Sequence, residues 1–181
     1  MIPAAGQTRV QLVTFRLGQH SFAVRVDQIW RVEALADFQV TRVPGAAAFL
    51  EGLVNLRGRV IPVIDLKKRL GLASDADYPP KARLLIVEME IAGQDEEKVA
   101  MIVDTVSDIC WFASANLLPP PPMVAEISSR YLSGVLEEAN QLWLVLDLRQ
   151  VLSVEERHSL RSEVEKEERS PTSPDVGVVQ A

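Results

Sequence analysis

Residues 52–66, GLVNLRGRVIPVIDL, decide the fold of this chain. Aliphatic residues flank the polar tip Asn55-Leu56-Arg57-Gly58, and Gly58 tolerates the positive φ that a tight hairpin turn requires. The stretch therefore predicts two antiparallel strands, the second of them at residues 60–64. Asp65, followed by LKKRL and Gly71, predicts a short helix with a side-chain N-cap and a glycine C-cap.

The same pattern returns in the second half of the chain. Residues 131–152 align without a gap to residues 49–70, at an offset of 82. The preceding strand matches as well, at an offset of 77: FAVRVDQI, which begins at Phe22, aligns with VAMIVDTV, which begins at Val99. Two matching segments in the same order, both bounded by turn residues, indicate an internal duplication.

We therefore predict two copies of a small all-β unit within residues 10–154. The copies lie at about residues 10–72 and 83–152, and because each is too small for a large core of its own, we expect them to share one. Residues 1–9 read as an N-terminal tail. Residues 155–181 begin with a charge-dense surface helix and end in a polar segment of low hydrophobicity that is typical of disorder.

Strand signals dominate the two copies, so the fold class is mostly β with short helices. Besides the opening hairpin, apolar and β-branched runs predict strands at residues 10–17, 22–26, 83–90, 99–103 and 142–146. The polar and charged run QDEEK, residues 94–98, predicts a long hairpin loop.

Composition excludes several classes of protein. The chain has 48% hydrophobic residues, a net charge of −6 and a single cysteine, Cys110, so an intramolecular disulfide is impossible. The acidic balance disfavours nucleic-acid binding, and no apolar run approaches the length of about 20 residues that spans a bilayer. We expect a cytoplasmic protein without a secretion signal and without direct membrane insertion.

No constellation in the sequence points to catalysis, a metal or a cofactor. His20 and His158 lie on different predicted elements, and no pair of cysteines or histidines has metal-ligand spacing. Asp65 and its counterpart Asp147 each precede a short helix, where capping explains a carboxylate. The three tryptophans could form a stacking platform for nucleic acid, but without a basic groove, packing in a core or interface explains them better.

Arg57 at the hairpin tip has two explanations. A guanidinium offers five donors on a rigid fork, which suits bidentate contact with a carboxylate on a partner. Most exposed arginines in turns are simply solvated. The physical chemistry of the turn leaves both open.

The hairpin stretch resembles the signature of the CheW family of chemotaxis coupling proteins, Gly-Val-x-Asn-Leu-Arg-Gly-x-x-x-Pro-Val-x-Asp-Leu, with Leu53 in place of valine. Residues 15–32 resemble the opening hairpin of that family, residues 40–46 its approach to the signature, and residues 103–109 and 131–148 its second half. The resemblance covers about residues 10–155.

This resemblance implies a non-enzymatic adaptor built from two similar five-stranded β-barrel subdomains around a shared hydrophobic core. Family members couple the cytoplasmic tips of methyl-accepting chemoreceptors to the regulatory domain of the histidine kinase CheA, and self-association in array rings is a further implication. The protein would then be cytoplasmic and recruited to membrane-bound receptor arrays. No cofactor is implied. Alternatives are a CheW-like adaptor of a non-motility chemosensory pathway and a small-barrel nucleic-acid-binding protein.

The resemblance also assigns roles to individual residues. By position, Arg57 becomes the signature arginine associated with coupling, and the residues that match partner-binding positions are Arg57, Leu56, Ile29, Arg31 and Val32. Ile29, Arg31 and Val32 correspond to the region that lines the family's groove between barrels. The residues expected to shape the hairpin instead are Asn55, Gly52, Gly58, Pro62 and Asp65.

Overall fold

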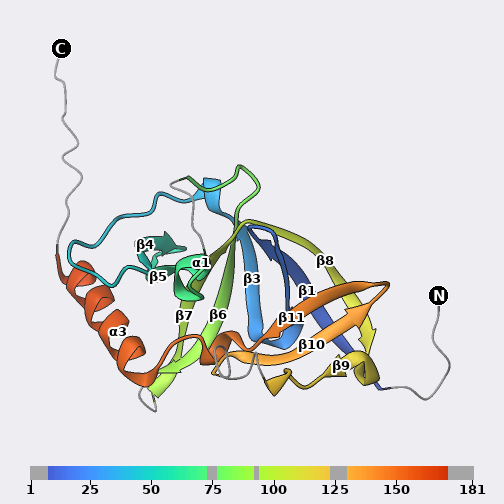
Figure 1. Cartoon of the computed structure of the whole chain (residues 1–181). Helices are drawn as coiled ribbons and strands as arrows, with labels where there is room; N and C mark the ends of the chain where they lie inside the picture. The colour runs from blue at the N-terminus through green and yellow to red at the C-terminus, as the bar shows by residue number, and fades with distance from the viewer. Residues whose placement is uncertain (1–7, 73–76, 92–93, 123–129, 171–181) are drawn as a thin grey trace.

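The computed structural model describes residues 8–72, 77–91, 94–122 and 130–170. Its described elements include two β-sheets, the helices α1 and α3 and four short 3-10 helices (Figure 1). Most of the predicted N-terminal tail (residues 1–7), part of the linker between the copies (residues 73–76) and nearly all of the polar C-terminal segment (residues 171–181) lie outside the described residues.

The predicted strands are present. The strands of the first copy are β1 (Arg9–Leu17), β2 (His20–Arg25), β3 (Ile29–Ala34), β4 (Leu50–Leu56) and β5 (Arg59–Asp65). Those of the second copy are β6 (Arg83–Ile91), β7 (Gln94–Val103), β8 (Thr105–Ala113), β9 (Leu117–Leu118), β10 (Leu132–Glu138) and β11 (Gln141–Leu146). The helices are α1 (Leu66–Arg69) and α3 (Val154–Arg169), with 3-10 turns η1 (Val26–Gln28), η2 (Leu35–Asp37), η3 (Ser114–Asn116) and η4 (Leu148–Gln150).

Each sheet combines strands from both sequence copies. The six-stranded sheet has the order β8-β1-β2-β11-β10-β9, and the five-stranded sheet has the order β3-β6-β7-β5-β4. The first hairpin of each copy therefore leaves its own copy and pairs with strands of the other. The division of the chain into copies thus differs from its division into sheets, and one sheet gains a sixth, two-residue strand.

The strand pairings between the two copies agree with the sequence offsets of 77 and 82. β5 runs parallel to β7 with Val63 opposite Ala100, and β11 runs parallel to β2 with Val145 opposite Ala23. Val145 follows Val63 by 82 positions, and Ala100 follows Ala23 by 77. The two junctions are therefore equivalent, which confirms the internal duplication.

The hairpin between β6 and β7 corrects one prediction. Residues 94–98 belong to β7 instead of forming a loop, and Glu88 and Met89 pair with Lys98 and Glu97. One pair of opposite charges supports this end of the ladder, because Lys98 and Glu88 form an ion pair of 2.9 Å between Nζ and Oε1.

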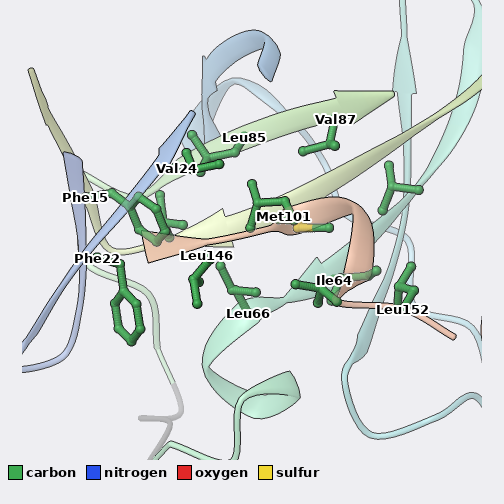
Figure 2. Packing of buried hydrophobic residues seen from close by; sticks show 14 of the residues in the cluster. Phe15, Phe22, Val24, Ile64, Leu66, Leu85, Val87, Met101, Leu146 and Leu152 are labelled. Atoms are coloured by element: carbon green, nitrogen blue, oxygen red, sulfur yellow. The ribbon is translucent and has the colours of Figure 1, made fainter. Parts of the chain in front are cut away.

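The largest hydrophobic core joins the two sheets. Figure 2 shows Phe15 and Leu146 from the six-stranded sheet gathered with Leu85 and Met101 from the five-stranded sheet. Two smaller clusters lie within one sheet each, around Ile86 and around Leu12. The expectation of a shared core is confirmed, and it follows from the exchange of hairpins.

The charge-dense segment after the second copy forms helix α3, as predicted. Ser153 and Glu156 make a capping box, because the Ser153 Oγ accepts from the Glu156 N–H at 3.2 Å and the Glu156 carboxylate accepts from the Ser153 N–H at 2.7 Å. Leu160 is buried in the shared core, so the helix is anchored to the fold. Of the described helices, none combines the length and apolar character that crossing a bilayer demands.

Candidate functional site: the β4–β5 hairpin and the exposed face of β3

The turn between β4 and β5 presents Arg57 to solvent. Arg57 has φ 54° and Gly58 has φ 84°, so both central residues adopt the left-handed conformation that matches the twist of a hairpin. The Asn55 Oδ1 accepts a hydrogen bond of 2.8 Å from the Gly58 N–H and holds the turn. Among the described residues none forms an ion pair with Arg57, so its guanidinium is available to a partner.

Gly52 is required by a close approach of the preceding chain. Thr41 and Leu53 exchange two backbone hydrogen bonds, of 2.9 and 2.8 Å, alongside β4. A Cβ on Gly52 would lie 2.1 Å from the Thr41 carbonyl oxygen, and the φ of Gly52 is 152°. Only glycine fits this position, in agreement with its expected role in shaping the hairpin.

Asp65 fixes the base of the hairpin to the helix that follows. Its side chain is fully buried, and its Oδ1 accepts a hydrogen bond of 3.1 Å from the Lys68 N–H as the N-cap of α1. Its Oδ2 accepts from the Tyr78 hydroxyl at 2.7 Å. Burial and the nearby Asp65 carboxylate raise the pKa of Tyr78, so the hydroxyl stays a donor. Sequence reasoning missed Tyr78, because this residue lies between the two predicted copies, at residues 73–82, where no element was expected.

The burial of Leu56 argues against its expected contact with a partner. Its side chain is 6% exposed and belongs to the cluster that contains Val54 and Ile61. Alternation along β4 explains the difference, because consecutive side chains of a strand point to opposite faces and Asn55 takes the exposed one. Leu56 therefore anchors the hairpin, as does Pro62, which is buried opposite Leu53 on β5.

The other three expected partner-binding residues lie together on β3. Ile29 packs against the shared core, Val32 is exposed, and the Arg31 Nη1 makes an ion pair of 3.1 Å with the Glu33 Oε1. In the strand order, β6, β7 and β5 separate β3 from β4. The hairpin tip with Arg57 and the face of β3 are therefore two separate parts of the candidate site.

Two further exposed apolar side chains lie on equivalent strands of the two copies. Sequence reasoning assigned the tryptophans to a core or an interface without deciding which, and it did not single out Ile109. Trp30 is 44% exposed, and the Lys98 Nζ lies 4.5 Å from the centre of its ring in a cation–π contact. Ile109 on β8 is 57% exposed and stands 77 positions after Val32. The offset of the duplication was the signal that could have found Ile109, because equivalent positions of the two copies expose equivalent side chains.

Proteins of known family share the sequence and the fold of this chain. The family model of the CheW-like domain matches residues 11–156. Chemotaxis protein CheW of Treponema pallidum (strain Nichols) is 28% identical over 87% of this chain and 90% of its own length. Chemotaxis protein CheW of Bacillus subtilis (strain 168) is 30% identical over 84% and 93%, respectively. The crystal structure of the scaffolding protein TtCheW from Thermoanaerobacter tengcongensis matches with a TM-score of 0.71 at 29% identity, over 82% of this chain and 97% of that one.

Proposed function

The chain belongs to the family of CheW-like domains, and on that premise we propose how it works as a chemotaxis coupling adaptor. It binds the regulatory domain of a CheA-type histidine kinase and the cytoplasmic tip of a methyl-accepting chemoreceptor at the same time. It carries out no chemistry of its own and acts at the cytoplasmic side of receptor arrays.

The single observation that carries this proposal is Arg57, which stands exposed at the tip of the signature hairpin and has no ion-pair partner in the part of the chain that the structure describes. The turn is held by the Asn55 amide, and the hairpin base is held by the Asp65 carboxylate. A guanidinium on a fixed turn loses less backbone entropy when it binds a carboxylate in two-point contact than one on a mobile loop would. We infer that Arg57 recognises an acidic group on a partner.

The exposed face of β3 suits a partner of a different kind. Val32 offers an aliphatic contact on the face that it shares with Ile29, since both stand opposite residues of the shared core. The ion pair of Arg31 with Glu33 lies on the other face of the strand. An amphipathic helix that docks on such a face gains affinity from apolar contacts and specificity from charges at the rim. We assign the receptor tip, a helical hairpin, to this part of the site.

Coupling then follows from assembly alone. An adaptor that holds kinase and receptor in one geometry lets a change in the receptor shift the balance between active and inactive kinase, provided that the two states bind the adaptor differently. The size of the effect is limited by that difference in affinity.

The test is calorimetric titration of the protein with the regulatory domain of the CheA-type kinase from the same genome. We expect saturable binding of roughly micromolar strength and a loss of about tenfold or more in the Arg57→Glu variant. Arg59→Glu is the matched control, because it reverses the same charge at another exposed position two residues along the hairpin. Equal losses in both variants, or normal binding by a folded Arg57→Glu variant, would contradict the role of Arg57.

A further inference from the structure

The duplication has placed two equivalent apolar surfaces on the molecule, and helix α3 covers one of them. α3 lies against β5 and β6. Its Leu160 is 3% exposed and belongs to the core cluster that also holds Leu50, Ile64 and Leu152. Leu160 and Phe49 line the same hollow. Most of α3 follows residue 156, where the match to the family domain ends.

The equivalent surface of the other copy is an open apolar hollow of about 90 Å³. Every residue that lines it has a counterpart at an offset of 77 or 82, and five of the seven counterparts belong to the core cluster that contains Leu160 or pack against it. The lining residues are Phe22, Leu70, Leu72, Tyr131, Leu132, Leu144 and Leu146. Their counterparts are Val99, Leu152, Val154, Phe49, Leu50, Pro62 and Ile64. Of the described residues, no helix stands over the hollow as α3 stands over its counterpart.

The surface of the hollow continues for a second helical turn. Val164, four residues after Leu160, shares a cleft with Val60 and Pro62 of β5. The counterpart of Val60 is Leu142 on β11, which is 56% exposed. A helix that docks here as α3 docks on the first copy would therefore need two aliphatic anchors, four residues apart.

The charged residues beside the hollow differ from those beside the surface that α3 covers. This difference indicates which charges a helix must carry to bind in the hollow. At the covered surface the Arg161 Nε lies 3.5 Å from the Glu97 Oε1. The counterpart of Glu97 is His20, an exposed residue that offers no carboxylate to an arginine. Beside the second anchor the hollow has a carboxylate that the covered surface lacks. Glu137 stands opposite Leu142 in the hollow, whereas the equivalent residue of the first copy is the neutral Asn55.

We propose that this hollow is a second docking site that binds an amphipathic helix of a partner protein. The helix presents aliphatic side chains at positions i and i+4, a carboxylate next to the first and a cation next to the second. The site includes neither Arg57 nor the face of β3, so it is additional to the proposed function and its failure would leave that function untouched.

A synthetic peptide tests the site directly. Its sequence is residues 153–170 of this chain with Arg161→Glu and Glu165→Lys, which keeps the net charge and an ion pair of opposite charges at i and i+4. Fluorescence anisotropy with the full-length protein is expected to give saturable binding below about 100 μM. The peptide with the unchanged sequence is expected to bind at least about fivefold more weakly, because its arginine meets His20 in place of Glu97 and its glutamate follows the anchor that would contact Leu142, beside Glu137.

Variants of the full-length protein locate the binding. Leu142→Asp is expected to weaken the binding of the charge-swapped peptide about tenfold or more. Leu118→Asp is the matched control, since Leu118 is an exposed leucine of the same sheet outside the hollow. No saturation up to about 1 mM, equal binding of the two peptides, or equal losses in the two variants would overturn the proposal. Concentration-dependent dimerisation of the protein that Leu142→Asp abolishes would overturn it too, by assigning the hollow to a second copy.

Discussion

Gly52 lies near the start of β4 and Gly58 in the turn that follows it, and the two differ in how much space a side chain would have. Both have positive φ, yet a Cβ on Gly58 would meet nothing within 4 Å, whereas one on Gly52 would overlap the Thr41 carbonyl. We expect Gly58→Ala to cost about 1 kcal/mol through backbone strain alone. Gly52→Ala should cost about 3 kcal/mol or more, because overpacking adds to the strain. Urea unfolding of both variants measures the difference, and equal costs would contradict the close approach of Thr41.

The segment from β5 through α1 depends on a hydrogen bond from outside it. We expect Tyr78→Phe to lower the free energy of unfolding at neutral pH by about 1–2 kcal/mol, because the buried Asp65 carboxylate loses one donor. The same variant should leave partner binding at Arg57 within about twofold of wild type once it is folded. Chemical denaturation followed by tryptophan fluorescence provides the measurement.

The pH dependence of this bond has a definite sign. Because folding raises the pKa of Tyr78, its contribution is fully present below the pKa of an unfolded tyrosine, about 10, and declines as the pH rises above that value. The difference in stability between wild type and Tyr78→Phe should therefore shrink between neutral pH and about pH 11. A constant or growing difference would show that the hydroxyl contributes in another way.

The junction between the two sheets contains a buried ion pair with an exposed counterpart. The Lys67 Nζ and the Asp104 Oδ1 lie 2.9 Å apart, and both side chains are nearly buried. The other Asp104 oxygen accepts from the Gly18 N–H at 2.6 Å, so Asp104 connects α1, the β1–β2 turn and the crossing from β7 to β8. The equivalent aspartate, Asp27, pairs with Arg25 at the surface, where the hydrogen bond from the guanidinium lowers the pKa of Asp27.

This contrast predicts unequal effects of one substitution at the two equivalent positions. Asp104→Ala should cost about 3–5 kcal/mol, because it leaves the Lys67 ammonium buried without its carboxylate. Asp27→Ala should cost less than about 1 kcal/mol, because water screens the exposed pair. Thermal and urea unfolding of the two variants decide the matter. If the costs are similar, the Lys67–Asp104 pair does not hold the sheets together.

The parts of the fold that depend on neighbours in sequence could be predicted from local chemistry. The turn at Gly58 and the cap at Asp65 are present as predicted, because short-range hydrogen bonds and the freedom of glycine at positive φ decide them. The duplication was also visible, since equivalent positions keep their side-chain types. The pairing of strands between the two copies was not visible, because β11, the second partner of β2, is 122 residues away and no local signal marks it.

The candidate site, too, has features that the sequence predicts and features that depend on the tertiary structure. Sequence alone determined the hairpin, the position of Arg57 at its tip and the family pattern around it. Only the tertiary structure decided that Leu56 is buried and that Tyr78 supports Asp65. It also decided that the two copies exchange hairpins and that α3 covers one of two equivalent apolar surfaces. The reason is physical: a turn is settled by the bonds that a few consecutive residues make, whereas burial depends on which distant strands supply the opposite face.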